Sequence, residues 1–401
     1  MFKIIKNIKK KSVRLGRIET RHGVINTPVF MPDATRGFVK TLGVADLANL
    51  KMGPLVVNTL HLYLQPGMKV IKKAHGIHKF MGWNGPLLSD SGGYQIFSLI
   101  HKNPKMGKIT DDGAIFKSPI DGSKHILTPE KSIQIQFDLG VDMMVALDDC
   151  PPNDYEREKI AKAVERTISW AKRCKLEYNK RVRSLESKIN PPAPLYKGGK
   201  IENLQSKIEN YQRPLLFAVI QGGADLELRR YCAAELIKIG FDGYGFGARP
   251  VDREGKFLGD ILKRTAEMIP EDSLRFALGI GLPKDIVRCV SYGWDIFDCV
   301  IPTREGRHGK LFLWASPQTP LLIRRGELKG RGFYQTINIL NSQFSSDFSP
   351  IDPNSKIKEL REYSKAYLHH LFKLKEPLGA RLATLNNLEF YLELMEKLRT
   401  N

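Results

Sequence analysis

The stretch LLFAVIQGGADLELRRYCAAELIKIGFDGYGFG, residues 215–247, indicates the fold of this chain. An apolar run of strand length, 215–221, is followed by a periodic helix-like segment, 226–240, and by a second short apolar run, 243–247. A strand–helix–strand succession is typical of parallel sheets, because the helix carries the chain back to the edge where the next strand begins. This stretch therefore predicts one βα repeat and the start of the next.

The same alternation recurs along the chain. Strand candidates lie at 25–31, 54–59, 86–90, 143–148, 215–221, 243–247, 275–281 and 295–301, and further helical patterns cover 128–140 and 282–293. This repetition predicts an α/β protein with a (β/α)8 TIM barrel. Two doubly wound halves are the alternative, but no GxGxxG or Walker sequence opens a helix to support it. We expect one domain over 1–401, with an N-terminal β extension and a C-terminal helical subdomain over about 333–401.

The composition excludes several classes of protein. Apolar residues make up 42% of the chain, yet no apolar stretch approaches the length that a transmembrane helix needs. The basic start, MFKIIKNIKKKSVRLGR, lacks the apolar core of a signal peptide, which favours a cytoplasmic protein. The five cysteines are scattered without a CxxC pair, so neither a disulfide framework nor a thiolate metal cluster is indicated.

The charge points to a polyanionic partner. The chain has 63 Lys and Arg against 43 Asp and Glu, a formal net charge of +20. A basic balance supplies the sequence-independent part of nucleic-acid affinity. The alternative is that the charge only keeps the protein soluble.

Polar residues and glycines recur where the predicted strands end. They are Asn58, Asp90, Asp148, Gln221, Gly247, Gly279 and Asp298. In a barrel the carboxyl ends of the strands face one mouth, so these residues are expected to gather there. Each one alone is also a common cap or turn residue, but three carboxylates and two carboxamides together favour a binding site.

The residues beside these strand ends suit a flat heterocycle. Gly92 and Gly93 permit a tight backbone after Asp90, and Tyr94 offers a ring for stacking. Carboxylates accept hydrogen bonds and a carboxamide both accepts and donates, which matches a ligand with N–H donors and a carbonyl. Guanine and its deaza relatives present that pattern.

Longer blocks of the sequence resemble one enzyme family. FMGWNGPLLSDSGGYQIFSL (80–99), LGVDMMVALDDC (139–150) and FDCVIPTREGRHG (297–309) are among the blocks that are similar, in order, to the tRNA-guanine transglycosylases of bacterial type, also called queuine tRNA-ribosyltransferases. The resemblance runs from about residue 13 to the C-terminus. It implies replacement of guanine at the wobble position of a tRNA with a GUN anticodon by a 7-deazaguanine, with preQ1 favoured, in queuosine biosynthesis. It also implies a homodimer.

The resemblance implies roles for individual residues. Asp298 is implied to be the nucleophile that attacks the ribose and holds the RNA covalently, and Asp90 the general acid and base for the departing and incoming bases. The other implied roles are base binding, by Tyr94, Asp148, Gln221, Gly247 and Ala248, and tRNA binding, by Arg304 and Arg307.

Two departures from the family pattern concern loops. The stretch GARPVD (247–252) stands where family members have a Gly-Gly-Leu-type run, and it places Ala248, Arg249 and Pro250 at the rim of the base pocket. We expect this rim to influence which base enters. The stretch 184–212, rich in Pro, Gly and Lys, is expected to be a flexible surface insertion, with bridging of RNA as the alternative.

The third departure concerns zinc. Family members carry a C-x-C-x-x-C cluster and a later histidine that hold a structural zinc ion. The matching positions here are Ser355, Ile357, Leu360 and Asn386. We therefore expect no metal and no other cofactor, and expect Ile357 and Leu360 to pack on one helix face with Leu368 and Leu371 instead. The alternative is that this subdomain, and the dimer contact beside it, has decayed.

Two other function classes stay open. One is a non-catalytic tRNA-binding paralogue or partner subunit, against which the intact Asp90 and Asp298 argue. The other is a barrel enzyme that acts on a small metabolite, against which the positive charge argues. Incorporation of labelled guanine into unmodified tRNA would separate the three.

Overall fold

The largest sheet has eight strands, hydrogen-bonded in the order β4, β14, β13, β12, β11, β10, β6 and β5. The computed structural model describes residues 2–8, 13–152, 155–189, 213–315, 323–324, 327–328 and 332–400. The eight strands are β4 (Val29–Pro32), β5 (Leu55–Val57), β6 (Leu87–Ser89), β10 (Met143–Val145), β11 (Leu215–Ile220), β12 (Gly243–Phe246), β13 (Leu274–Ala277) and β14 (Ile296–Cys299). Strand β14 pairs in parallel with β4 and β13, β11 with β10 and β12, and β10 with β6.

The two ends of this strand order are joined. Asp33, directly after β4, forms a parallel bridge with Val56 of β5, and the Ala34 amide donates to Val56 O at 2.7 Å. The sheet therefore returns on itself, as eight βα repeats require. The predicted α/β fold of the TIM-barrel type is confirmed.

Helices follow the strands as the sequence pattern predicts. The predicted helical segments 128–140, 226–240 and 282–293 are α6, α9 and α11. Helices of the first three-quarters of the chain are α1 (Val44–Asn49), α2 (Thr59–Leu62), α3 (Met68–Lys73), α4 (Ile77–Met81), α5 (Gly93–Lys102), α6 (Pro129–Leu139), α7 (Arg157–Ile189), α9 (Leu226–Ile239), α10 (Gly259–Met268) and α11 (Pro283–Ser291). Later helices are α12 (Ile301–Arg307), α13 (Lys358–Glu362), α14 (Lys365–Leu374) and α15 (Pro377–Thr400), and short turns of other helix types are η1 (Tyr63–Gly67), η2 (Pro104–Met106) and η3 (Ser342–Phe344).

Local sequence sets the helix ends. The Thr128 hydroxyl accepts the Lys131 amide at the start of α6, and Gly140 ends that helix with a left-handed backbone. Asp225 caps α9 by accepting the amides of Glu227 and Leu228. Side-chain acceptors at the first turn and glycine after the last are the signals that fix helix boundaries.

Smaller sheets lie outside the eight-stranded sheet. Strands β1 (Phe2–Ile8), β2 (Val13–Thr20) and β3 (Gly23–Thr27) form the N-terminal β extension, β7 (Gly107–Thr110), β8 (Gly113–Lys117) and β9 (Lys124–Leu127) form a second sheet, and two further pairs are β15 (Lys310–Trp314) with β18 (Tyr334–Asn338) and β16 (Ile323–Arg324) with β17 (Glu327–Leu328). The predicted strand 25–31 is thus divided between β3 and β4.

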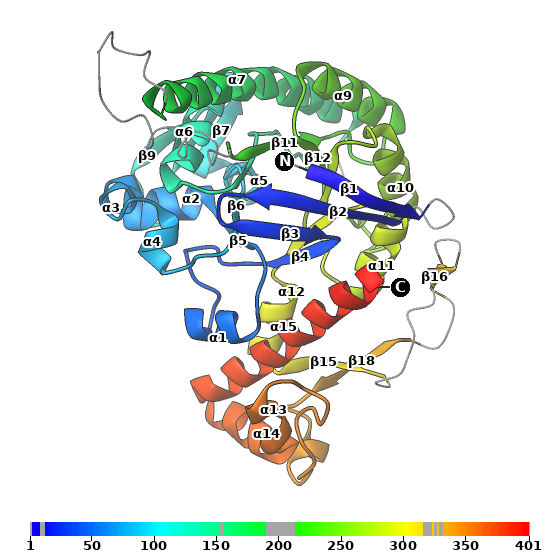
Figure 1. Ribbon diagram of the computed structural model, residues 1–401. Coiled ribbons are helices and arrows are strands. Elements are labelled where there is room, and N and C mark those ends of the chain that lie inside the picture. The colour runs from blue at the N-terminus through cyan, green and yellow to red at the C-terminus, as the bar shows by residue number, and fades with distance from the viewer. Residues whose placement is uncertain are drawn as a thin grey trace, which may run out of the picture. The chain divides into compact units, whose positions relative to one another are not determined.

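The chain forms two compact units. Unit 1 comprises residues 1–3, 17–25 and 57–275, and unit 2 comprises residues 4–16, 26–56 and 276–401. In unit 1, α7 packs on α6 and α9 (Figure 1). Trp170 of α7 is fully buried. In unit 2, α15 packs on α12, α14 and β15, and the Tyr391 hydroxyl of α15 donates to Gly281 O.

Helix α7 extends into the stretch that the sequence predicts to be a flexible insertion. Residues 184–189 belong to this helix, and residues 190–212 lie outside the described residues. The flexible insertion therefore stays a prediction.

Candidate active site

Asp298 lies at the carboxyl end of β14, in unit 2. The strand buries Ile296 and Phe297 before it, whereas Asp298 is only partly buried. The Gly279 amide donates to Asp298 Oδ1 at 3.0 Å. Burial raises the pKa of Asp298 from 3.8 to about 6; the Gly279 hydrogen bond opposes this rise, and the nearby carboxylate of Asp33 adds to it. With a pKa of about 6, the carboxylate is ionised at neutral pH. Few hydrogen bonds draw electron density from its oxygens, which suits a nucleophile.

Asp90 follows β6, in unit 1, and is held by several donors. The amides of Thr59 and Gly92 donate to Oδ1 at 2.9 and 3.1 Å, and Gln95 Nε2 donates to Oδ2 at 2.9 Å. Asn58 Nδ2 also donates to Oδ2, and Asn58 itself caps α2. These bonds fix the orientation of the carboxylate, which is what a group that transfers a proton requires.

Asp148 and Gln221 form a buried pair, also in unit 1. Gln221 Nε2 donates to Asp148 Oδ2 at 2.6 Å, and the exposed fractions are 8% for Asp148 and 1% for Gln221. Burial raises the pKa of Asp148 to about 6. The hydrogen bond from Gln221 lowers this pKa, and the negative charge of Asp149 raises it further. Gln221 Oε1 is buried and has no hydrogen-bond partner among the residues that the structure describes. A buried acceptor without a partner is costly, so Gln221 Oε1 is a candidate acceptor for a ligand donor.

The end of β12 fits closely against this pair. A Cβ at Gly247 would lie 2.5 Å from Gln221 Cδ, so only glycine leaves room for the carboxamide. The Gly247 amide donates to Ile220 O at 2.9 Å and is therefore already used within the protein. Ala248, which has a left-handed backbone with φ of 100°, presents its amide to the Cys150 thiol. Both predicted backbone amides are thus engaged within the protein, but the thiol that accepts from Ala248 is a weaker acceptor than the carbonyl that accepts from Gly247, so the Ala248 amide is the easier of the two for a ligand to recruit.

Tyr94 lies in the first turn of α5. Tyr94 is 55% exposed, so its ring is accessible for stacking with a ligand. The preceding Gly92 has φ of 78°, and a Cβ on Gly93 would meet Leu147 at 2.8 Å and Asp148 O at 3.2 Å. The glycines thus allow the start of α5 to approach the end of β10 closely.

The predicted tRNA-binding arginines lie on α12, directly after β14. Arg304 pairs with the adjacent Glu305 at 3.2 Å, and both side chains keep contact with solvent. Arg307 Nε donates to Thr303 O at 3.2 Å. Lys310 Nζ, 3.6 Å from Glu305, adds a further cation nearby.

The predicted site residues thus form two groups. Asp90, Tyr94, Asp148, Gln221, Gly247 and Ala248 belong to unit 1, and Asp298, Arg304 and Arg307 belong to unit 2. Within unit 1, the Asp148–Gln221 hydrogen bond and the Gly247 contact join the ends of three strands.

Three further residues were not singled out from the sequence. Asp33 affects Asp298 and lies two residues past the run 25–31, so extending the strand-end argument to that run would have found it. Gln95 lies in the first turn of α5, which starts between it and Asp90, and from there its side chain reaches the Asp90 carboxylate; no strand-end signal marks it in the sequence. Cys150 follows Asp148 and Asp149 directly, but the spacing of the cysteines gives no signal for it. Burial raises the pKa of its thiol to about 12, so it stays protonated.

Two histidines and an aspartate cluster before β6 and β10. His22 Nδ1 lies 2.8 Å from Asp142 Oδ1, His78 Nε2 lies 3.5 Å from Asp142 Oδ2, and the three ligand atoms lie within 4.8 Å of one another. The imidazole rings are stacked with centroids 3.6 Å apart, so their nitrogens face two oxygens of one carboxylate. The Leu87 amide also donates to Asp142 Oδ2 at 2.9 Å. Burial alone would raise the pKa of Asp142, but the bonds from His22, His78 and Leu87 lower it below its usual value. Asp142, directly before β10, thus links the start of β6 to the two imidazoles.

The residues at the family's zinc positions do not fit that metal. Ser355, Ile357, Leu360 and Asn386 offer no thiolate or imidazole. Leu360 is fully buried on α13, as predicted, but Ile357 lies at the N-cap of that helix and is only partly buried, so the two do not share a helix face. The Asn386 amide donates to Phe312 O at 3.0 Å.

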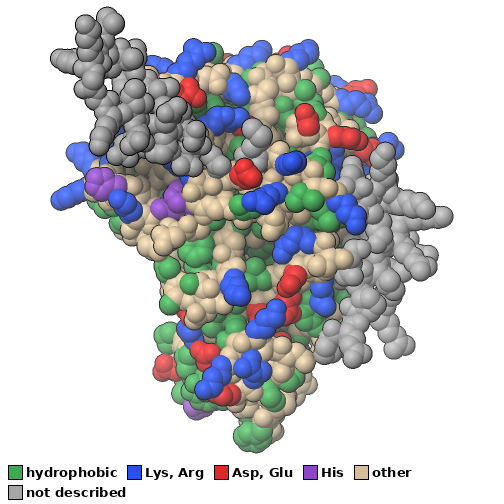
Figure 2. Space-filling model, viewed as in Figure 1, with side chains coloured by type: hydrophobic (Ala, Val, Ile, Leu, Met, Phe, Trp, Pro, Cys, Tyr) green, Lys and Arg blue, Asp and Glu red, His purple; other side chains and the backbone are tan. Residues whose placement is uncertain are grey.

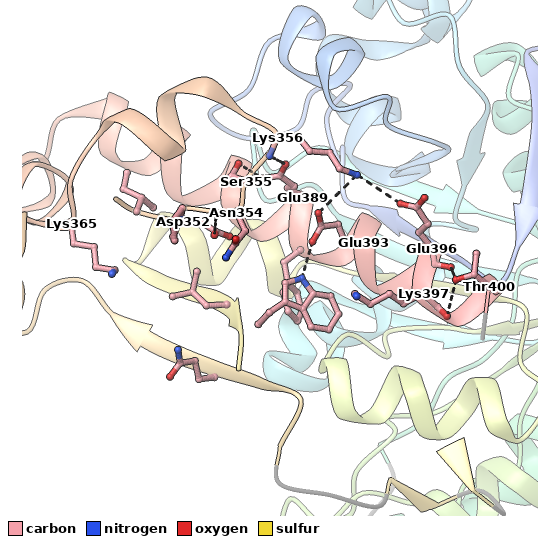
Figure 3. A pocket seen from close by; sticks show the side chains of 16 residues that line it. Asp352, Asn354, Ser355, Lys356, Lys365, Glu389, Glu393, Glu396, Lys397 and Thr400 are labelled. Atoms are coloured by element: carbon pink, nitrogen blue, oxygen red, sulfur yellow. Dashed lines mark hydrogen bonds and ion pairs between the residues drawn. The ribbon is translucent and has the colours of Figure 1, made fainter. Parts of the chain in front are cut away.

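A hydrogen-bonded clamp occupies this region. The Ser355 hydroxyl donates to Glu389 of α15, and the Lys356 amide donates to the same carboxylate at 2.7 Å. Arg361 Nη1 donates to Ser355 O at 2.6 Å. Burial raises the pKa of Glu389, while the Ser355 hydrogen bond opposes the rise. Figure 3 shows Ser355, Lys356 and Glu389 at the wall of a pocket of about 530 Å³, with Glu393 bonded to the Trp314 indole at 2.8 Å.

The described helices include none that combines the length and the apolar character needed to span a bilayer.

A family model described as queuine tRNA-ribosyltransferase matches residues 9–401 of the chain.

Similar proteins carry the same description. The chain is 39% identical over 386 residues to the queuine tRNA-ribosyltransferase of Halothermothrix orenii. The matched region covers 96% of this chain and 89% of the relative. It is 39% identical over 398 residues to that of Caldanaerobacter subterraneus subsp. tengcongensis, with 99% and 92% covered. It is 37% identical over 398 residues to that of a Staphylococcus aureus strain, with 98% and 90% covered.

Proposed function

Since the chain belongs to the queuine tRNA-ribosyltransferase family, whose members are pentosyltransferases, we propose that it exchanges guanine in tRNA for a 7-deazaguanine. The observation that carries the choice of base is the buried Asp148–Gln221 pair with its open Oε1 acceptor. Guanine offers N–H donors at N1 and at its exocyclic amine, which a carboxylate and a carbonyl oxygen would accept. A 7-deazaguanine keeps this edge and differs only in the five-membered ring, so one pair of side chains serves both bases.

The proposed first step is attack by Asp298 on the ribose. A carboxylate oxygen forms a bond to C1′ while the bond from C1′ to guanine N9 breaks, and guanine leaves with the electron pair. Asp90, in its protonated form, gives a proton to the departing base. The raised pKa of Asp298 and its single amide contact from Gly279 support its role as nucleophile.

The second step reverses the first with a new base. Asp90, now a carboxylate, takes a proton from the incoming base, whose nitrogen attacks C1′ and displaces Asp298. Two displacements at one carbon retain its configuration and leave the RNA backbone uncut. The Ala248 amide would donate to the base carbonyl, and Tyr94 would stack on the ring.

The finer substrate is proposed from the same contacts. We take preQ1 as the incoming base and the wobble guanine of a GUN anticodon as its target, with the nucleotide turned out of its stack to reach the pocket. Arg304 and Arg307 would contact the anticodon loop, and Figure 2 shows Lys and Arg side chains spread over the drawn face. A tRNA substrate would place the protein in the cytoplasm, and we propose a homodimer as its assembly.

The test is exchange itself. Purified protein is incubated with unmodified tRNA and labelled guanine, and label in the RNA supports the proposal. Tight tRNA binding without uptake would instead indicate a non-catalytic paralogue or partner subunit. Competition by unlabelled preQ1 then tests the choice of base, because a base that fails to compete is not the substrate.

We also propose that the protein folds without zinc. The clamp of Ser355, Lys356, Arg361 and Glu389 ties the segment before α13 to α15, where relatives with the cysteine cluster would use a metal. Buried hydrogen bonds to a carboxylate are strong enough to hold such a junction when every partner is satisfied.

A further inference from the structure

Arg229 is a fully buried charge on α9. Its three guanidinium nitrogens each donate to a different backbone carbonyl: Nε to Gly223 O at 2.7 Å, Nη1 to Ile220 O at 3.1 Å and Nη2 to Gly247 O at 2.8 Å. Its exposed fraction is 0%. The guanidinium carries its donors on three separate nitrogens in a fixed planar fork, which lets it reach three acceptors that lie in different directions.

The three carbonyls belong to the chain segments that carry the base-binding groups. Two of them flank Gln221 in sequence, and the third precedes Ala248 directly. Gly247 also packs against the Gln221 carboxamide, so the position of one segment sets the position of the other. One side chain therefore fixes the carboxyl ends of β11 and β12 together.

The cost of this arrangement is high for a purely structural residue. No ion pair of Arg229 is found among the described residues, and the guanidinium is supported only by the three carbonyls and the ring of Phe246, 4.1 Å from its centre. Burial lowers the pKa of Arg229 to about 9, so it still carries its charge at neutral pH. Well-packed apolar side chains usually stabilise a core better than an isolated charge.

Building on the proposed base exchange, we propose that Arg229 is a positioning residue that holds the ends of β11 and β12 where Gln221 and Ala248 can bind the base. It does not touch the base. Its effect is to keep the Gln221 Oε1 acceptor and the Ala248 amide at a fixed separation.

The experiment compares Arg229→Lys with the full-length wild-type protein. A lysine keeps the charge, but its donors all lie on one nitrogen and cannot reach the carbonyls that three guanidinium nitrogens serve, so the two strand ends lose their common anchor. We expect the KM for guanine to rise by roughly ten- to a hundredfold, with kcat at saturating guanine much less affected. The KM for tRNA should stay near the wild-type value, because phosphate contacts dominate that affinity. If the lysine variant does not fold, Arg229→Gln, which can still donate to a carbonyl, gives the same readout.

A matched control shows whether an effect is specific to Arg229 or follows from the loss of any buried guanidinium. Arg275 of β13 is 9% exposed and donates to Ile269 O at 2.9 Å; its neighbour Leu274 donates to Asp242 O, directly before the start of β12, so Arg275 lies near the start of β12 and not near its carboxyl end. Arg275→Lys should lower the melting temperature without changing the KM for guanine. Millimolar guanidinium should restore guanine binding to Arg229→Ala and not to Gln221→Ala.

The outcomes separate two failures. A wild-type KM for guanine in folded Arg229→Lys, with a raised KM in Gln221→Ala, would overturn the positioning role alone. A wild-type KM in Gln221→Ala as well would show that the proposed base pocket is wrong. Equal loss of kcat in both lysine variants, without a change in KM, would make Arg229 merely structural.

Discussion

Asp298 and Asp90 both follow a strand of the barrel sheet, yet they are held in different ways. Asp298 accepts one amide of another residue, Gly279, and has a second carboxylate, Asp33, nearby. Asp90 accepts hydrogen bonds from at least four groups, including the side chain of Gln95. Sparse hydrogen bonding leaves electron density on a carboxylate for bond formation, whereas many donors fix its geometry for proton transfer. The same residue type can therefore divide two chemical roles.

The largest expected effect is from Asp298→Asn. The amide has nearly the same shape but is no nucleophile, so exchange should fall by at least about a thousandfold. A denaturation-resistant RNA adduct should be lost, while the tRNA dissociation constant stays near wild type. The measurement is guanine exchange beside gel analysis of trapped RNA, and exchange near the wild-type rate would refute the assignment.

Asp90→Asn should have the next largest effect. Removal of a general acid and base typically costs about a hundred- to ten-thousandfold. Because Asp298 remains, some covalent RNA should still accumulate although turnover is slow. The contrast between the two variants in adduct formation is the check, and no difference between them would remove the division of roles.

The pH dependence of single-turnover exchange tests the raised pKa of Asp298. The nucleophile must be ionised, so the rate should fall about tenfold for each pH unit below about 6 and level off above it. Asp148, whose pKa is also raised to about 6, acts in the same direction on base binding. Saturating guanine therefore separates the two, and a rate that is flat from pH 5 to 8 under that condition would contradict the Asp298 assignment.

The thermal stability of the same variants should change in opposite directions. The folded-state pKa of Asp298, about 6, lies above its ordinary value of 3.8, so its favourable contribution is complete below pH 3.8 and lost as pH rises through 6. Above pH 6 the folded protein holds a costly charge, and Asp298→Asn should raise the unfolding free energy by ~1–3 kcal/mol. Asp90→Asn should lower it by a similar ~1–3 kcal/mol, because the amides of Thr59 and Gly92 can lose their acceptor. Melting curves at pH 4 and pH 8 measure both, and the gain at Asp298 should vanish at pH 4.

The smallest expected effect is that of a chelator. Purified protein should contain no stoichiometric zinc by elemental analysis, and its melting temperature should not change when a chelator is added. Glu389→Ala is the positive control, since it leaves the Ser355 hydroxyl and the Lys356 amide without their acceptor and should lower stability. A chelator-induced loss of structure would refute the zinc-free proposal.

The fold could be predicted from sequence because its signals are local. Strand β11 and helix α9 occupy nearly the residues that the apolar run 215–221 and the periodic segment 226–240 indicate. The helix packing near the family's zinc positions was predicted less well. Ile357 was expected on a helix face and lies at a cap, because a helix as short as α13 has too few residues for a reliable periodic pattern.

The sequence by itself determined the order of strands and helices and the residue types at the strand ends, since periodicity and turn chemistry act over a few residues. Only the tertiary structure decided which distant groups share an environment. Asp33 beside Asp298, Arg229 beneath Gly247 and Ser355 against Glu389 are separated by many residues in the chain. Such contacts arise from burial, which removes water from polar groups and obliges each to find a partner, and no local pattern encodes which partner that is.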